Sequence, residues 1–280
     1  MEAPFELLEE GLSARVDANR PAIVRGYVPA LDASAARGAV EDVERDLGHL
    51  QAFGLRPIGQ LSTRVVHEED WAEAWKQHFP VLRVGRRVVI RPTWREHQPQ
   101  PTDVVISLDP GMAFGTGLHP TTRLCLAALE EWADEGVVED GNVLDVGCGS
   151  GILGICACLL GARSVVALDT DPVAVQATLD NARRNALAGR LTAQRGSLPL
   201  GQLVQFDLVM ANLVAGVLIG LAAELHRVMG ATGGRLLASG IFVDREDDVR
   251  REFELAGMRI IGQWKEGDWL ALGAVRQGER

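Results

Sequence analysis

Three glycines separate an apolar segment from a helix-like segment in the middle of this 280-residue chain. They are Gly147, Gly149 and Gly151 in the sequence NVLDVGCGSGILG. Glycine lets the backbone turn sharply and, having no Cβ, lets a ligand approach closely. Asp169 ends the next apolar segment, where a carboxylate accepts hydrogen bonds from both hydroxyls of a ribose. The pattern predicts a nucleoside-binding loop.

Asp145 distinguishes two classes of nucleoside ligand. Read from Gly149, the loop also matches the GxGxxG fingerprint of dinucleotide-binding proteins, although a lone match is weak. Asp145 precedes the loop, where its negative charge opposes a pyrophosphate and favours an ammonium or a sulfonium. S-adenosylmethionine carries both cations and a ribose. We therefore expect Asp145, Gly147, Gly149 and Asp169 to bind this cofactor, with a turn-stabilising role as the alternative for Asp145.

A second glycine-rich segment, LDPGMAFGTGLHPTTRLCL, covers residues 108–126. Pro120 suits the first turn of a helix. Thr121 and Thr122 then place hydroxyls at a helix N-terminus, which favours the methionine carboxylate of the cofactor, and helix capping is the alternative for one of them. The remaining expected contacts of this segment are Gly115 and Thr122 with the cofactor, and Phe114 in the apolar wall of the catalytic site.

Asn212 follows the apolar segment FDLVMA at residues 206–211. A neutral amide at a strand end accepts a hydrogen bond from an amine and orients it, whereas a carboxylate would hold that amine as an unreactive cation. We expect Asn212 to be catalytic and to lie against the cofactor, although asparagine is also common in turns. His119 has the chemistry of an acid or base, but a histidine beside a proline more often packs or caps a helix.

Strands and helices must alternate to bring these residues together. Apolar runs predict strands at 104–108, 142–146, 164–168, 206–211, 234–240, 258–264 and 269–275. Helices are predicted at about 120–132, from 152, from 172, at 218–229 and at 244–256. Such alternation indicates an α/β fold with a doubly wound, mostly parallel sheet, which binds its ligands at the carboxyl ends of the strands.

The first 65 residues predict a small α+β unit. Its expected elements are an apolar segment at 5–12, a strand at 22–28, a helix at 33–51 and a strand at 58–66. A helix at 68–80 with Trp71 and Trp75 on one face, a strand at 87–91 and a proline-rich loop follow. We place a first domain at 1–64, a linker at 65–100 and a second domain at 101–280.

Composition excludes several classes of protein. The net charge is −10, and residues 1–70 contribute 7 − 13 = −6 of it, which opposes non-specific nucleic-acid binding and suits either a basic partner or a solvated surface. No apolar run is long enough to span a membrane, and the acidic start is unlike a secretory signal, so we expect a cytoplasmic protein. The four cysteines form no CxxC pair and the six histidines have no metal spacing, so we expect reduced thiols and no metal.

Together these segments resemble the methyltransferases that modify protein eleven of the large ribosomal subunit. The likeness covers roughly residues 65–276 and is carried by DWAEAWKQHF, RPTW, LDPGMAFGTGLHPTT, VLDVGCGSGILGI, ALDTDPVAVQATLDNARRN, DLVMANLVAG and LLASGI. The cofactor positions of that family fall on Thr122, Gly147, Asp169 and Asn212.

The resemblance implies a seven-stranded, Rossmann-like class I methyltransferase domain that uses S-adenosylmethionine. It also implies a small N-terminal ferredoxin-like domain that recruits the ribosomal protein. Here that domain lacks the opening strand of a complete βαββαβ unit, so we expect it to be truncated. The products in that family are methylated lysine ε-amino groups and, in some members, a methylated α-amino terminus. The expected partner is therefore ribosomal protein eleven, and the protein is expected to be a monomer.

The expected reaction is an in-line displacement in which a neutral amine attacks the sulfonium methyl and leaves S-adenosylhomocysteine. Three alternatives remain open. The chain could methylate another amine or an amide such as a glutamine side chain, although those enzymes usually show NPPY where this chain has NLVA from Asn212. It could be a nicotinamide-dependent oxidoreductase that uses the GSGILG sequence. It could also bind the nucleoside without catalysis.

Overall fold

The computed structural model describes residues 33–52, 61–63, 79–109, 114–201 and 204–277. The chain divides into two compact units, Met1–Glu68 and Glu69–Arg280. In the first unit the predicted helix is confirmed as α1 (Ala33–Ala52). The predicted segments at 5–12 and 22–28 lie outside the described residues, as does the helix predicted at 68–80 except for residues 79 and 80, which are not helical. Residues 61–63 of the strand predicted at 58–66 form no strand. The boundaries proposed at 64 and 100 stay predictions.

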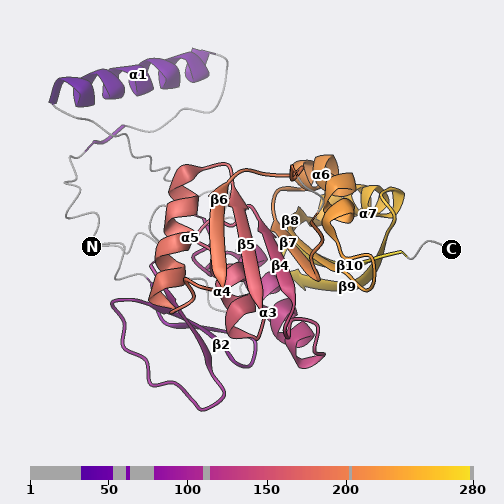
Figure 1. Cartoon of the computed structure of the whole chain (residues 1–280). Helices are drawn as coiled ribbons and strands as arrows, with labels where there is room; N and C mark the ends of the chain where they lie inside the picture. The colour runs from indigo at the N-terminus through magenta and orange to yellow at the C-terminus, as the bar shows by residue number, and fades with distance from the viewer. Residues whose placement is uncertain (1–32, 53–60, 64–78, 110–113, 202–203, 278–280) are drawn as a thin grey trace. The chain divides into compact units, whose positions relative to one another are not determined.

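The second unit contains a sheet of seven strands, in the order β6-β5-β4-β7-β8-β10-β9 (Figure 1). The first five strands in that order are parallel, and β10 is antiparallel to both of its neighbours. Their bounds are β4 Asn142–Val146, β5 Ser164–Asp169, β6 Leu191–Arg195, β7 Leu208–Asn212, β8 Arg235–Phe242, β9 Met258–Glu266 and β10 Trp269–Arg276. The predicted α/β fold with a mostly parallel sheet is confirmed.

Two details of the predicted sheet are wrong. The strand at 104–108, β3 (Val104–Leu108), belongs to a separate sheet of three strands in the order β1-β2-β3. It pairs in parallel with β2 (Val88–Pro92), and β2 pairs on its other side, antiparallel, with β1 (Leu82–Val84). The seventh strand of the large sheet is β6, which the sequence did not predict. As an edge strand, β6 buries only Leu191 fully, so it lacks the apolar run that marked the others.

Helices cover both faces of the large sheet because successive strand residues point to opposite sides. On β4, Val143 packs into one buried cluster with residues of α3 and α4, and the next residue, Leu144, packs into another with residues of α6 and α7. The helices are α3 Pro120–Asp134, α4 Ile152–Leu159, α5 Pro172–Arg184, α6 Ala215–Val228 and α7 Glu246–Leu255, which follows the short 3-10 helix η2 Val243–Arg245. The four cysteines are free and buried, as expected for structural thiols.

One buried carboxylate attaches the small sheet to α3. Glu130, which is 2% exposed, accepts hydrogen bonds from the backbone N–H groups of Arg86 (2.7 Å) and Arg87 (2.6 Å) in the turn between β1 and β2. These bonds compensate the cost of burying the charge. Gly85 must be glycine there, because it has φ +66° and a Cβ would lie 2.1 Å from the Glu130 Oε2 atom. The small sheet is thus fixed to α3 within the second unit.

Candidate functional site

Three strand ends bring Asp169, Gly147 and Asn212 to one level of the large sheet. β4 lies between β5 and β7, and Val146 at its end pairs with the residues that precede Asp169 and Asn212. Because neighbouring strands lie about 4.8 Å apart, the Cα atoms of Asp169 and Asn212 are separated by roughly 10 Å. The two side chains predicted to hold a ribose and an amine therefore stand on either side of the glycine loop.

The glycine loop needs its glycines for reasons visible in the structure. Gly147 and Gly149 have φ values of +76° and +54°, in the left-handed region. A Cβ on Gly147 would lie 2.4 Å from the Leu213 Cδ2 atom, and one on Gly149 would lie 2.5 Å from the carbonyl oxygen of Phe114. The loop is anchored below by Thr178 of α5, whose hydroxyl donates to the Gly149 carbonyl oxygen (3.0 Å). A side chain on either glycine would displace the loop.

Asp169 stands half-buried at the end of β5, at the rim of the loop. Its Oδ2 atom accepts from the Gly149 N–H (2.9 Å), and its Oδ1 atom accepts from the Asp171 N–H (3.0 Å). These two bonds orient the carboxylate. Each carboxylate oxygen accepts more than one hydrogen bond, so both still have room for ribose hydroxyls.

Asp145 lies beneath the same loop and is 1% exposed. Its Oδ2 atom accepts from the Gly154 N–H in the first turn of α4 (3.1 Å), so the turn-stabilising role left open by the sequence is present. Its Oδ1 atom is buried and has no hydrogen-bond partner among the described residues. Burial, and secondarily the charge of Asp169, raise the pKa of Asp145 to about 7. A nearby cation would favour the ionised form.

At the start of α3, Thr121 and Thr122 have different surroundings, which the sequence alone did not predict. His119 is the N-cap, and its Nδ1 atom accepts from the Thr121 N–H and lies 2.8 Å from the Thr121 hydroxyl. His119, and neither threonine, therefore caps the helix, and Thr121 is the threonine whose hydroxyl contacts the cap. Thr122 is fully buried, and its hydroxyl has no partner among the described residues. Burial and the neighbouring Arg123 lower the pKa of His119, which suits the accepting, neutral ring of a cap.

The charge of Asp145 acts on the helix that carries Thr122. Cys125 follows Thr122 by one turn on the same face of α3. Burial raises the pKa of Cys125 to about 12, and the Ser239 hydroxyl and the Asp145 charge also act on this thiol. The two buried oxygens without partners therefore come from helix α3 and strand β4, and the Asp145 charge acts on a thiol one turn beyond Thr122.

Phe114 and Gly115 are held against the glycine loop through Ser150. The Ser150 N–H donates to the Phe114 carbonyl oxygen (2.8 Å), and its hydroxyl donates to the Gly115 carbonyl oxygen (2.6 Å). Gly115 has φ +97°, and its Cβ would lie 2.9 Å from the Ser150 hydroxyl oxygen. The backbone of both predicted residues therefore borders the loop, while the Phe114 side chain is 59% exposed.

Four aromatic rings form a continuous row beside the strand ends. The ring centroids of Phe114 and His119 lie 5.6 Å apart, those of His119 and Trp269 4.9 Å, and those of Trp269 and Phe242 5.1 Å. Trp269 reaches this edge because β10 is antiparallel, so its first residue pairs with Phe242 at the end of β8. The row is an apolar wall next to the carboxyl ends of the parallel strands.

Sequence reasoning missed several residues that shape the site. Trp269 and Phe242 gave no signal because each stands at the end of an apolar strand, where a packed aromatic is ordinary. The polar residues that it missed hold the loops through bonds between distant segments, and they are Ser150, Thr178 and Asn181. Two asparagines one helical turn apart, Asn181 and Asn185, were the available signal for the last of these.

The residues present fit a nucleoside that carries a cation. Asp169 offers a carboxylate at the rim, Gly147 and Gly149 leave space that a Cβ would fill, and Asp145 and Thr122 each keep a buried oxygen without a partner among the described residues. Unpaired buried oxygens cost about 1–3 kcal/mol each, and a ligand group that donates to them removes this cost. An ammonium group beside Asp145 would satisfy this need, whereas a pyrophosphate would not.

Comparisons with known proteins agree with this reading. The sequence model of the family described as "Ribosomal protein L11 methyltransferase (PrmA)" matches residues 18–277. The chain belongs to this family. A ribosomal protein L11 methyltransferase of Chloroflexus aurantiacus is 45% identical over 94% of this chain and 85% of that protein, and one of Herpetosiphon aurantiacus is 42% identical over 92% and 84%.

A solved structure supports the same assignment. The crystal structure of a ribosomal protein L11 methylase from Lactobacillus delbrueckii subsp. bulgaricus aligns with a TM-score of 0.64 and 33% identity. It covers 71% of this chain and 100% of that one. The family resemblance, the class I methyltransferase fold and the use of S-adenosylmethionine are thereby confirmed, and the oxidoreductase alternative is set aside.

Two further observations concern other kinds of site. Within the described ranges, no group of three or more His, Cys, Asp or Glu side chains is placed to hold a metal ion. In the part of the chain that the structure covers, no helix combines the length and apolar character needed to cross a bilayer.

Proposed function

We propose that this protein transfers methyl groups from S-adenosylmethionine to amino groups of ribosomal protein L11, namely lysine ε-amino groups and the N-terminal α-amino group. The observation that carries the proposal is the level row of Asp169, Gly147 and Asn212 across β5, β4 and β7. It puts the carboxylate, the open loop and the neutral amide in the order that a ribose, a sulfonium and an amine require. Membership of the L11 methyltransferase family supports the choice of substrate.

Each binding residue has a role in this scheme. Asp169 accepts the ribose hydroxyls, Gly147 and Gly149 allow close approach, and Asp145 and Thr122 satisfy the ammonium and carboxylate of the methionine part. Gly115 borders the same space through its contact with Ser150. When bound, the cofactor supplies an electrophilic methyl on a sulfonium.

Asn212 is proposed to orient the nucleophile. It is half-buried at the end of β7, level with Ser239 of β8, and its side chain has no hydrogen bond within the described residues. Its amide oxygen accepts from an amine N–H and leaves the nitrogen lone pair for the methyl. Alignment of this kind supplies about 7–11 kcal/mol of the barrier reduction in well-oriented reactions.

Deprotonation of the amine is the main energetic obstacle. At pH 7 a lysine of pKa about 10.4 loses its proton at a cost of about 4.6 kcal/mol, against about 1 kcal/mol for an α-amino group of pKa near 7.8. Phe114 and Trp269 offer apolar faces beside the strand ends, and the sulfonium adds a positive charge. Both influences lower the pKa of the amine, so bulk water takes the proton and no general base is assigned.

The acidic N-terminal part of the chain is proposed to recruit the substrate, since a basic ribosomal protein is attracted to the net charge of −6 that residues 1–70 carry. We further propose that the protein acts as a monomer in the cytoplasm, without contacting nucleic acid directly. These assignments rest on charge and on the resemblance described above.

The test is mass spectrometry of purified L11 after incubation with the full chain and labelled S-adenosylmethionine. We expect label on lysine side chains and on the α-amino group, with the latter absent from L11 whose N-terminus is acetylated. Label confined to glutamine, or an enzyme that binds the cofactor and leaves L11 unlabelled, would contradict the proposal. An L11 fragment without the labelled positions is the matched control.

A further inference from the structure

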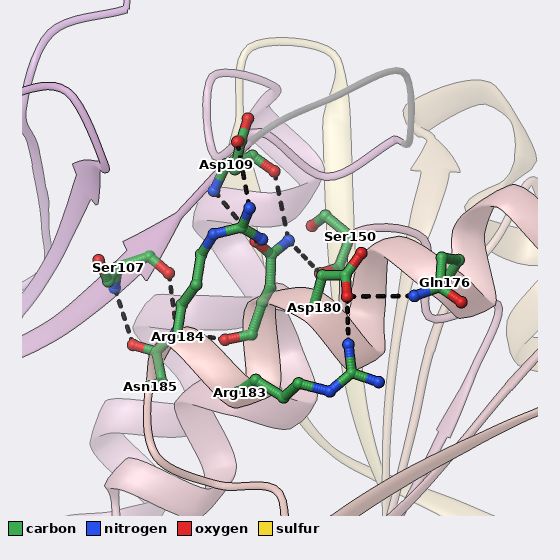
Figure 2. Close-up of polar contacts among 9 residues, drawn as sticks. Ser107, Asp109, Ser150, Gln176, Asp180, Arg183, Arg184 and Asn185 are labelled. Carbon is green, nitrogen blue, oxygen red and sulfur yellow. Dashed lines mark hydrogen bonds and ion pairs between the residues drawn. The ribbon is translucent and has the colours of Figure 1, made fainter.

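Asn181 of α5 and Asn185, the C-cap of α5, take the place of a neighbouring strand along the edge of β3 and the residue after it. Figure 2 shows Asn185 beside Ser107. Asn185 accepts from the Ser107 N–H (2.8 Å) and donates to the Ser107 carbonyl oxygen (2.7 Å). Asn181 accepts from the Asp109 N–H (3.1 Å) and donates to the Asp109 carbonyl oxygen (3.3 Å). Each side-chain amide thus pairs with both backbone groups of one residue, as a peptide group of an adjacent strand would.

The spacing of helix and strand makes this pairing possible. Four residues of a helix rise about 6 Å, and two residues of a strand advance about 6.6 Å. Asn181 and Asn185 therefore meet Ser107 and Asp109, which present their N–H and carbonyl groups on the same edge. Together the two asparagines fix the register of α5 against the end of β3.

Asn181 makes one connection that Asn185 does not. Its Nδ2 atom also donates to the carbonyl oxygen of Ser150 in the glycine loop (2.9 Å), and the residue is 1% exposed. Ser150 in turn donates to the carbonyl oxygens of Phe114 and Gly115. A chain of short hydrogen bonds thus runs from the end of β3 through Asn181 to the glycine loop and the start of the aromatic row.

We propose that Asn181 is a positioning residue for methyl transfer, which holds the glycine loop and the Phe114 segment in one arrangement relative to the end of β3. The proposal rests on the proposed function, because that function assigns Phe114 to the wall beside the amine. Asn181 acts through Ser150 and contacts neither reacting group. An amide is required because its nitrogen must donate twice while its oxygen accepts, whereas an aspartate would turn a negative oxygen toward two carbonyl oxygens.

The matched variants Asn181→Ala and Asn185→Ala test this role. Asn185 also donates to the Asn181 carbonyl oxygen (2.8 Å), so each alanine removes three bonds to backbone groups, and we expect similar falls in Tm. Because misplacement of reacting groups is costly, kcat should fall about tenfold or more in Asn181→Ala and stay within about twofold in Asn185→Ala. The Kd for S-adenosylmethionine should change by less than about threefold in both, since Asp169 and Thr178 still hold Gly149. Equal kcat values in the two variants would overturn the proposal.

A double-mutant cycle with Ser150→Ala provides the second test. This variant removes the hydroxyl bond to Gly115, the next link of the chain. If Asn181 acts through Ser150, the double variant should lose little more kcat than Asn181→Ala alone, because residues in one network do not add. Losses that multiply would show independent effects and contradict the proposal.

A third measurement does not depend on the methyl acceptor. Hydrogen exchange of the Ser150 amide, which donates to Phe114, should be faster in Asn181→Ala than in Asn185→Ala. If the wild-type chain fails to methylate L11, the proposed function fails, and this exchange still decides whether Asn181 holds the loops. If Asn181→Ala does not fold, Asn181→Ser replaces it with the same expectations, since it keeps a polar side chain and lacks the amide that donates twice. Equal exchange rates in the two variants would overturn the positioning role.

Discussion

The polar side chains in the two halves of the binding site differ in burial and in hydrogen bonding. The outer half consists of Asp169 and Asn212 at the strand ends, both half-buried. The inner half consists of Asp145 and Thr122, both buried, and each has one oxygen without a hydrogen-bond partner in the described residues. Asp169 is already oriented by two backbone N–H groups, whereas Asp145 has a pKa raised to about 7. Two aspartates on neighbouring strands therefore differ in burial and in how many of their oxygens have hydrogen-bond partners.

This difference predicts that only in the inner half will a substitution weaken cofactor binding and also stabilise the free protein. Removing an outer side chain takes away ligand contacts that water otherwise satisfies. Removing an inner polar atom takes away a ligand contact and also relieves the cost of an unpaired buried oxygen in the free protein. Measurements of cofactor affinity and of unfolding on the same variants will separate the two halves.

The largest effect is expected for Asp169→Ala. The variant loses two ribose contacts and the partner of the Gly149 N–H, which together are worth about 3 kcal/mol or more. Calorimetry should show at least about a hundredfold loss of S-adenosylmethionine affinity, with no gain in Tm. Asp180→Ala, which removes an exposed carboxylate of α5 paired with Arg183, is the control. Retained affinity in Asp169→Ala would remove this residue from the site.

Asn212→Ala should lower kcat by about 10–100-fold, because the amine loses its alignment. The cofactor Kd should change by less than about threefold. Steady-state kinetics on L11 and titration with the cofactor measure the two quantities separately. Unchanged turnover would defeat the amine-orienting role and make the strand-end asparagine a turn residue only.

Asp145→Asn should weaken cofactor binding but raise the free energy of unfolding of the free protein. An acid whose folded pKa is raised to about 7 from about 3.9 destabilises the fold as the pH rises through that interval, so the free variant should be about 1–3 kcal/mol more stable than wild type at pH 8. Because a cation prefers the ionised carboxylate, wild-type affinity should rise by up to tenfold per pH unit below 7 and level off above it. The variant should bind about tenfold more weakly at pH 8 and lose the pH dependence. A pH-independent wild-type Kd would show that Asp145 does not face the cation.

The smallest effect is expected for Thr122→Val, compared with Thr121→Val. Loss of the Thr122 hydroxyl should weaken cofactor binding about three- to tenfold and leave the free energy of unfolding equal or up to about 1 kcal/mol higher. Loss of the Thr121 hydroxyl removes the contact with the cap His119 and should cost about 1 kcal/mol of stability, with little change in affinity. Equal losses of stability in the two variants would show that the Thr122 hydroxyl is hydrogen-bonded in the free protein, which contradicts the prediction.

The sequence predicted most of the large sheet because its buried strands are continuous apolar runs. It missed β6, whose sequence LTAQR is mostly solvent-facing, and β1, which has three residues. It placed β3 in the wrong sheet because an apolar strand does not reveal its neighbour. Local pattern therefore specified which segments are strands, while pairing depended on contacts such as that of Glu130 with the turn before β2.

The residues of the site also fall into those that a local pattern predicts and those that depend on long-range contacts. Residues at strand ends, such as Asp169 and Asn212, were predictable because position and residue type coincide. The distinction between Thr121 and Thr122 was not, since it depends on the helical phase set by His119. Ser150 and Asn181 were missed because their bonds join segments far apart in the sequence, and no local spacing records which carbonyl groups will be brought near them.

The antiparallel course of β10 has a consequence for how the protein is made. A nascent chain that has just emerged through β6 already contains the glycine loop and Asp169, yet it lacks Asn212 and the ring of Trp269. Such a chain has the groups assigned to hold the nucleoside without those assigned to use it. The aromatic row beside the strand ends is therefore complete only when the hairpin of β9 and β10 has paired with β8, after every residue assigned to bind the nucleoside has been made.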